Sequence, residues 1–449
     1  MTEKSADRRT PEASLPHVPA TAGLDIYEIR NDVEALHEPA SPTARPVGWG
    51  FLILYWLAFV GLWIPVLSPL LVTLALKVNG LVGPAQAGAS LGVVVSAGGL
   101  LAMLANPFFG RMSDATTSRL GMRRPWIVFG LVGGAVATLG MALAPSVTAL
   151  AIAFAATQCL FNACTAGLFG VLADQVPPGQ RGMVGGLIGA SVPLALPAGS
   201  FLVQLVSPNL LAMFLLPLAV GAIPLLLFTV LLKDRILPVA EKPAFSWRDF
   251  LGTFWVNPLR HRDFGYNWWA KFFFVFAYAF LTTYQAFFLI QRLGIPATSV
   301  PALIFQSTLV LSAMNLISSL GGGKLSDVLR RRKIFVIVAA LIYGAGLFVI
   351  ASSTTFELFL VGIGIAGFGF GAWGAVDTAL TVDVLPNPST AAKDLAVANI
   401  ANTLPQSLAP AIAPLILASA GGSYPVLYAV AAACAVFSAL FVLPIKSAR

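Results

Sequence analysis

Charged residues are scarce in this chain, and their scarcity indicates its structural class. Only 10% of the 449 residues are Asp, Glu, Lys or Arg, whereas 57% are hydrophobic. Soluble domains carry about 25% charged residues, so this composition excludes an ordinary globular protein. It is typical of an all-α polytopic membrane protein, in which each helix satisfies its own backbone hydrogen bonds. The net charge of +8 does not indicate a nucleic-acid partner, because nearly all the charges lie in loops between apolar segments.

Histidine and cysteine are also few. The three histidines (His17, His37 and His261) lie outside the apolar segments, and the three cysteines lie inside them without the spacing of a metal site. We therefore expect no metal, no cofactor and no catalytic triad, and we do not expect an enzyme.

Long apolar runs dominate the rest of the sequence. Segments of about 20 apolar residues can cross a bilayer as helices, and the chain contains twelve of them. They cover residues 49–76, 86–109, 126–144, 148–173, 183–206, 210–232, 264–290, 299–321, 334–352, 356–381, 395–419 and 424–444. The expected domains are a disordered tail (1–47), a six-helix bundle (48–232), a linker (233–263) and a second bundle with a short tail (264–449). The tail holds six prolines and one possible amphipathic helix, over 24–38.

The cations predict the orientation in the cell membrane. If the N-terminus is cytoplasmic, the inner loops and the C-terminal tail hold 19 Lys and Arg residues, and the outer loops hold only Lys77 and Arg292. Cytoplasmic loops carry the excess of Lys and Arg, so both termini are expected to be cytoplasmic.

One charged phrase occurs twice. Gly110 and Asp114 precede a basic loop with Arg119, Arg123 and Arg124, and 213 residues later Gly323 and Asp327 precede a cluster with Arg331. A second phrase pairs Asp174 with Asp383, at an offset of 209 residues, and a cation follows each of them, Arg181 or Lys393. A repeat at half the chain length predicts two parallel halves, as in many transporters.

These residues resemble the major facilitator superfamily over about residues 48–445. The longer form of the loop, from Ser113-Asp114 to Arg124-Pro125-Trp126, is similar to the glycoside–pentoside–hexuronide cation symporters and the plant-type sucrose/proton symporters. Lys393-Asp394-Leu395, Asn399 and Leu404-Pro405-Gln406 are similar to the same group. The resemblance implies two pseudo-symmetric six-helix bundles, with spans 1, 4, 7 and 10 around a central cavity.

The charged loops are candidates for a gate on the cytoplasmic side. Asp114 could pair with neighbouring arginines or face a helix N-terminus of the other half, holding that side closed until it breaks during transport. The alternative is that the arginines only set the topology. The gating candidates are Gly110, Asp114, Arg119, Arg123, Arg124, Asp174, Arg181, Asp327 and Arg331.

Two ionisable residues lie within the spans. Lys271 in span 7 and Asp377 in span 10 are at similar depths, and charges inside a membrane are costly and therefore candidates for function. We expect them to form a pair that couples transport to protons, or else a structural ion pair. Spans 1 and 2 contain no Asp or Glu, whereas the melibiose-type symporters of the group named above place cation-binding acids in span 2. Facilitated diffusion, without a coupling ion, therefore remains an alternative.

Neutral polar residues mark the expected substrate path. Amide side chains both donate and accept hydrogen bonds, which suits a ligand with many hydroxyl groups. The substrate-binding candidates are Gln158, Asn162, Tyr284, Gln285, Trp373, Asn399, Asn402 and Gln406. Hydrogen bonding between helices is the alternative role for each. The sequence thus favours a monomeric, proton-coupled secondary transporter of a small sugar-like solute. An exporter or a facilitator of another small molecule is the alternative.

Overall fold

Helices and the short loops between them make up the ranges that the computed structural model of the chain describes. These ranges are residues 46–242, 261–329, 331–385 and 391–446, apart from the side chains of 241, 323–329, 391–393 and 395–396. They contain twelve helical spans that are long and apolar enough to cross a membrane, and no strand. The expected all-α, twelve-span class is therefore confirmed. The predicted tail up to residue 45, its helix over 24–38 and residues 243–260 of the predicted linker lie outside the described ranges.

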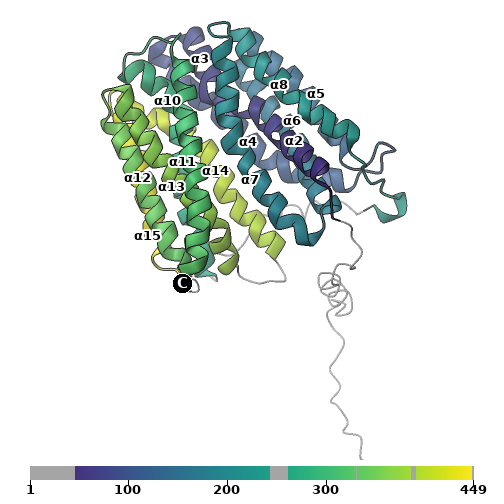
Figure 1. The fold of residues 1–449 in the computed structure, drawn as a ribbon. Coiled ribbons are helices and arrows are strands. Elements are labelled where there is room, and N and C mark those ends of the chain that lie inside the picture. Colours follow the sequence, from purple (N-terminus) through teal and green to yellow (C-terminus); the bar gives the residue numbers. More distant parts are fainter. Residues whose placement is uncertain (1–45, 243–260, 330, 386–390, 447–449) are drawn as a thin grey trace, which may run out of the picture. The chain divides into compact units, whose positions relative to one another are not determined.

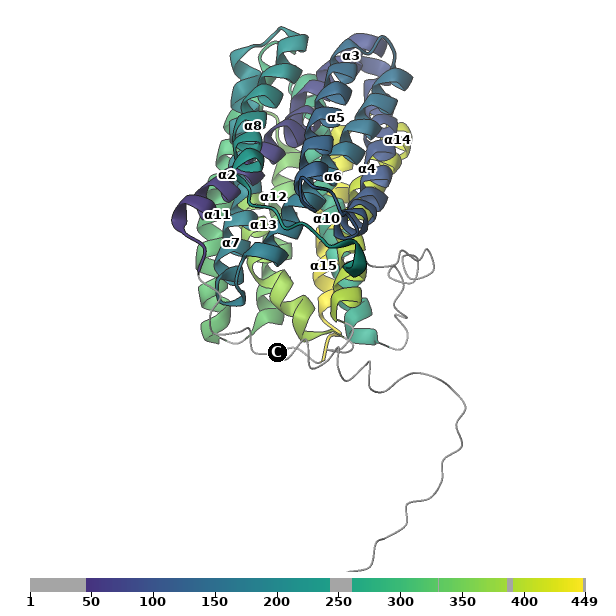
Figure 2. The same ribbon diagram turned by 90° about the vertical axis from the view of Figure 1, so that its right-hand side faces the viewer.

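Six spans precede residue 232 and six follow residue 261 (Figures 1 and 2). The first six are α2 (Trp49–Ser68) with η1 (Pro69–Thr73) and α3 (Leu74–Val82), then α4 (Pro84–Asp114), α5 (Arg124–Leu143), α6 (Val147–Gln175), α7 (Pro178–Leu205) and α8 (Leu210–Leu231). The second six are α10 (Arg262–Phe287) with η3 (Phe288–Arg292), then α11 (Val300–Leu329), α12 (Arg332–Ser352), α13 (Phe356–Asp383), α14 (Ala391–Ser419) and α15 (Tyr424–Val442). The first span of each half contains one π-helical turn, η1 or η3.

The repeat in the sequence is also a repeat of helix caps. Ser146 begins α6 and its hydroxyl accepts a hydrogen bond from the Ala149 amide; Thr355 begins α13 and accepts one from Leu358. A Ser or Thr at this position satisfies a backbone N–H that the helix leaves unpaired. The two caps are 209 residues apart, so the fourth span of each half begins with the same local chemistry.

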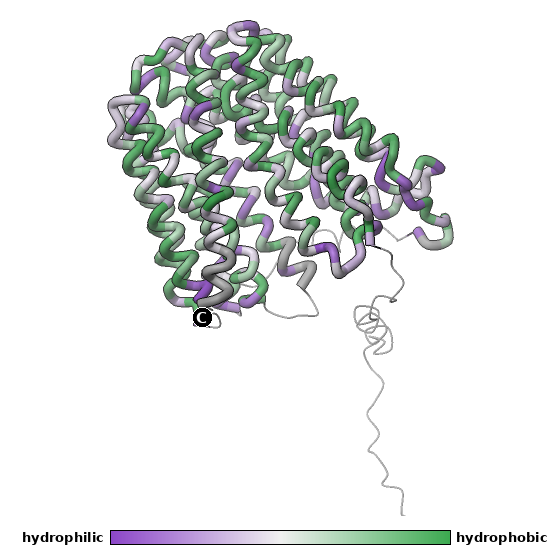
Figure 3. Tube along the Cα trace, in the orientation of Figure 1, coloured by the Kyte–Doolittle hydropathy of each residue, from purple (hydrophilic) through white to green (hydrophobic). Residues whose placement is uncertain are grey.

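Apolar side chains face outwards as well as inwards. Val230, Leu320 and Leu415 are at least 70% exposed although each lies in a membrane-spanning helix. Hydrophobic residues cover the helices and hydrophilic ones gather mainly near the helix ends (Figure 3). An apolar outer surface of this extent fits a lipid environment.

Candidate functional site

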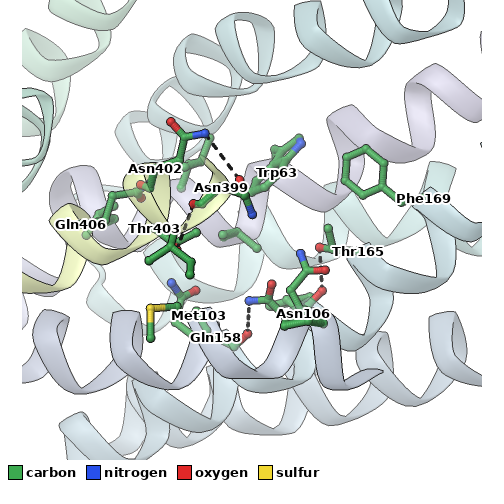
Figure 4. Close-up of a pocket in the computed structure, with 18 of the residues that line it drawn as sticks. Trp63, Met103, Asn106, Gln158, Thr165, Phe169, Asn399, Asn402, Thr403 and Gln406 are labelled. Atoms are coloured by element: carbon green, nitrogen blue, oxygen red, sulfur yellow. Dashed lines mark hydrogen bonds between the residues drawn. The ribbon is translucent and has the colours of Figure 1, made fainter. Parts of the chain in front are cut away.

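A cavity of about 570 Å³ lies between the two halves, within the size range of small-molecule sites. Its wall comes from α2, α4 and α6 of the first half and from α14 of the second (Figure 4). The lining residues are Trp63, Val66, Leu67, Leu70, Ala102, Met103, Asn106, Pro107, Arg111, Gln158, Phe161, Asn162, Thr165, Phe169, Asn399, Ile400, Asn402, Thr403 and Gln406.

Five of the eight predicted substrate residues meet in this cavity. Gln158 and Asn162 come from α6, and Asn399, Asn402 and Gln406 come from α14. Two helices thus present amide groups to one space because each amide pair or stripe lies on one helical face. Their role in binding stays a prediction.

Several of these amides donate hydrogen bonds to carbonyl groups of their own helix and keep part of their hydrogen-bonding capacity. The Asn162 side chain donates to the Gln158 carbonyl (2.7 Å), and the Gln406 side chain donates to the Asn402 carbonyl (2.9 Å). The side-chain oxygens of both residues remain available as acceptors. The side chains of Gln158 and Asn106 make no hydrogen bond with any described residue, so a ligand or water can use both amides.

Sequence reasoning missed part of the wall. Asn106 and Arg111 on α4, and Thr165 and Thr403, also line the cavity. Arg111 was counted among the loop cations because it follows Gly110 directly. Asn106 was detectable as an amide in an apolar span, one turn before that loop.

Three predicted substrate residues lie elsewhere. Tyr284 is fully buried, and its hydroxyl is within hydrogen-bond distance of the carbonyls of Gly88 (3.3 Å) and Pro410 (3.2 Å). Gln285 is 4% exposed, and Trp373 is stacked on Phe274 with ring centres 4.0 Å apart. None of the three lines a described cavity wall, because close packing covers each of them, and their role in substrate binding stays a prediction.

Tyr284 belongs instead to a contact that closes the cavity at one end. A Cβ on Gly92 of α4 would lie only 2.4 Å from the carbonyl oxygen of Pro410 on α14, so only glycine permits this approach. On the same side, Ser200 and Thr308 hydroxyls lie 2.7 Å apart, and Gln291 donates to the Pro84 carbonyl. The halves therefore meet at the end away from the charged loops, and the cavity lies on the charged-loop side of this contact.

A buried arginine organises the charged loop of the first half. Arg123 is bonded to Asp114 (Nη1–Oδ1, 2.5 Å) and Asp174 (Nε–Oδ2, 2.8 Å), and it also donates to Ser113. Burial lowers the pKa of Arg123, but its hydrogen bonds to Asp174 and Asp114 and their negative charges outweigh burial and raise that pKa. The side chain therefore stays charged and joins the ends of α4, α5 and α6. All three helices belong to one half, so in this conformation Asp114 pairs with a neighbouring arginine, as one of the two expected arrangements has it. Its gating role stays a prediction.

Asp234, which sequence reasoning missed, fixes the same loop from the end of α8. Its carboxylate accepts hydrogen bonds from the backbone N–H groups of Arg123 and Arg124, both at 2.7 Å. Gly121 has φ of +103°, and a Cβ there would meet the Asp234 side chain. The signal was an acid amid the linker cations, next to Lys233.

The second half repeats one of these ion pairs. Arg332 is bonded to Asp383 (2.7 Å), and the two residues are separated by 51 positions, as are Arg123 and Asp174. Arg331, the gating candidate in this cluster, is exposed and precedes α12, and its gating role stays a prediction. The side chain of Asp327 lies outside the description.

The remaining gating candidates make only local contacts with described residues, and their gating role stays a prediction. Arg124 donates to the carbonyls of Leu232 and Val230, and Arg181 donates to those of Val176 and Ala173, so each caps a helix end. Arg119 is exposed and makes no ion pair with a described residue, because its loop turns it to solvent. A Cβ on Gly110 would meet nothing within 4 Å.

Lys271 and Asp377 are in direct contact. Lys271 Nζ lies 2.8 Å from Asp377 Oδ2, and both side chains are less than 10% exposed. The Thr381 hydroxyl accepts from Lys271 (3.1 Å) and from Asn267 (3.0 Å), and donates to the Asp377 carbonyl (2.9 Å). The pair joins α10 to α13 inside the second half and does not line the amide cavity; its coupling role stays a prediction.

Comparison with known proteins bears on the whole chain. The sequence matches the family model of the Major Facilitator Superfamily over residues 51–319 and 298–449. A search of curated proteins returned no match.

Solved structures similar to the chain are transporters. The nucleoside transporter NupG matches with a TM-score of 0.71 and 14% identity, covering 88% of this chain and 99% of its own. A D-xylose-proton symporter matches with a TM-score of 0.61 and 16% identity, covering 88% and 97%. A bacterial homolog of the human lysosomal transporter Spinster, inward-facing and occupied, matches with 0.62 and 15%, covering 88% and 96%. At these identities the likeness shows the fold alone.

Proposed function

The chain belongs to the Major Facilitator Superfamily, and from that premise we propose that this multi-pass membrane protein carries a neutral, hydroxyl-rich solute, a sugar or a glycoside, by alternating access. The amide-lined cavity is the observation that supports this substrate class. Six of its lining residues are Asn or Gln and two are Thr. Such side chains donate and accept hydrogen bonds without charge, which matches hydroxyl groups.

Three aromatic rings from α2 and α6 fit the same ligand. Trp63, Phe161 and Phe169 line the cavity beside the α4 and α6 amides. A sugar presents both hydroxyl edges and C–H faces, so amides and rings can contact it at once. The described wall contains no Asp or Glu, which disfavours a cationic substrate.

We assign both termini and the charged loops to the cytoplasm and the protein to the cell membrane. The excess of Lys and Arg in these loops supports that assignment. The cavity would then face the cytoplasm in the conformation described. We also propose that the chain acts as a monomer and belongs with the glycoside–pentoside–hexuronide symporters, on the loop that contains Asp114 and Arg123.

Uptake into proteoliposomes tests the substrate class. Radiolabelled sucrose and simple glycosides should enter vesicles that contain the protein, and unlabelled sugar trapped inside should drive counterflow. Gln158→Leu and Asn402→Leu should each raise KM about 2- to 10-fold, the effect of one lost hydrogen bond. Gln204→Leu is the matched control, because Gln204 is an α7 amide outside the cavity wall. Equal effects at all three positions, or no sugar uptake, would refute the assignment.

Proton coupling is a separate proposal, and facilitated diffusion is its rival. The absence of a carboxylate from the described cavity wall favours the facilitator, whereas the buried Lys271–Asp377 pair supports coupling. An imposed pH gradient distinguishes them. Accumulation above the external concentration supports coupling, and equilibration without accumulation supports the facilitator.

A further inference from the structure

A second cavity, also of about 570 Å³, lies between the halves on a different flank. It shares no lining residue with the amide cavity. Its wall comes from α7 of the first half and from α10, α11 and α13 of the second, and α7 packs beside α11 (Figures 1 and 2). No sequence pattern predicted this space, because it depends on how α7 and α11 pack.

Glycines leave this space open. Gly185, Gly186 and Gly189 line it from α7, and a Cβ at any of them would meet no atom within 4 Å. Close helix packing therefore does not require glycine at these three positions, whereas at Gly92 a Cβ would meet the other half.

The wall opposite α7 contains polar groups without hydrogen-bond partners among the described residues. Ser312 lines the cavity, is 4% exposed, and its Oγ has no hydrogen-bond partner among the described residues. The side chain of Asn315, one turn along α11, and that of Thr378 on α13 have no partner among the described residues. Asn315 is half-buried and Thr378 is exposed, so only Ser312 carries the cost of a buried polar group without a partner, about 1–3 kcal/mol. A ligand that supplies a hydrogen bond to Ser312 gains affinity.

The chemistry of this wall differs from that of the amide cavity. Its described lining contains no Asp, Glu, Lys, Arg or His, and one amide, Asn315, in place of six. Leu196, Leu311 and Phe370 contribute apolar surface, and Phe370 stacks on Tyr278 with ring centres 4.6 Å apart. Pockets with apolar walls and a few placed polar groups bind mainly apolar small molecules.

We propose that the α7/α11/α13 cavity is a second ligand site, which binds an uncharged, mainly aromatic or apolar small molecule through one or two hydrogen bonds to Ser312 and Asn315. This site is independent of the sugar site proposed above, and either can exist without the other.

Protection of a reporter cysteine tests the second site. In a full-length variant with the three native cysteines replaced by alanine, Ser319→Cys places a thiol on the cavity wall. The probe is 2-naphthol, an uncharged aromatic with one hydroxyl group, and the readout is the labelling rate with N-ethylmaleimide in nanodiscs. We expect saturable slowing at Ser319→Cys and none at Gly182→Cys, a position on α7 outside the cavity wall.

Two further changes separate binding from general partitioning. Gly189→Phe should place a ring inside the cavity, obstruct it and abolish protection. Gly182→Phe should leave protection unchanged, because Gly182 lies outside the wall; neither position has an atom near its Cβ. Asn315→Leu should weaken protection about 3- to 10-fold through one lost hydrogen bond. Unsaturable slowing, equal slowing at both reporters, protection that survives Gly189→Phe, or equal protection by D-glucose would each overturn the assignment. Sugar uptake measured on the same variants keeps this outcome distinct from that of the transport function.

Discussion

Neutralising one member of the Lys271–Asp377 pair should destabilise the protein strongly. In Lys271→Met the Asp377 carboxylate loses its 2.8 Å partner while its side chain is only 9% exposed. Removing one partner of a buried ion pair costs about 3–5 kcal/mol, because the other charge remains uncompensated. Loss of the second Lys271 bond, to Thr381, adds only about 0.6 kcal/mol by the average for hydrogen bonds within membranes. The stranded charge, and not the hydrogen bond, therefore dominates the expected loss.

The double change Lys271→Met with Asp377→Leu removes the penalty and should recover stability. Replacing a buried ion pair by apolar residues is often neutral or stabilising. The assay is the midpoint of thermal unfolding of the purified protein in detergent, with each single and the double variant. Lys77→Met is the matched control, because Lys77 donates only to the Ala142 carbonyl and has no carboxylate partner in the described structure. Its midpoint should move little.

Transport by the same variants tests the coupling role. If the pair handles the coupling proton, the double variant should exchange solute but not accumulate it against a gradient. Wild-type accumulation in the double variant would leave the pair a structural role only. A double variant no more stable than the single ones would refute the energetic reasoning, since the stranded charge could not then be the cause of the loss.

Three further changes test the gate, the closed end and the tail. Asp114→Asn should impair transport severely at near-normal expression, because the Asp114 carboxylate accepts a hydrogen bond from buried Arg123. Arg119→Lys should have a mild effect, since Arg119 is exposed. Initial uptake rates compare the two variants, and equal mild effects would contradict a gating role. Gly92→Ala should slow transport at least about 10-fold, because its Cβ would lie 2.4 Å from the Pro410 carbonyl oxygen and a clash of about 1.4 kcal/mol already gives that factor. The control is Gly179→Ala, where a Cβ meets nothing within 4 Å. Normal turnover in Gly92→Ala would show that the contact between Gly92 and Pro410 is not required. Deletion of residues 1–45 should leave insertion and transport intact, because a proline-rich polar segment cannot build a core; loss of uptake by a correctly inserted protein would point to regulation by the tail.

The sequence alone determined the class of the protein and the place of most polar wall residues. Long apolar runs must become helices in a bilayer, since no water is present to satisfy exposed backbone groups, so twelve spans could be predicted from hydropathy. The amides of α6 and α14 were found for the same reason: helical periodicity fixes which residues share a face, and an amide on an apolar helix stands out. The separation of 51 residues in both Arg–Asp pairs likewise follows from a repeat visible in the chain.

Only the tertiary structure decided what those faces meet. Tyr284 and Asn402 are both polar residues within apolar spans, yet Tyr284 packs against Gly88 and Pro410 while Asn402 lines a cavity. Periodicity gives the angle of a side chain around its own helix but not the distance to the neighbouring one. That distance depends on which small residues face each other across the two halves: at Gly92 they bring the helices into contact, and at Gly189 they leave a space.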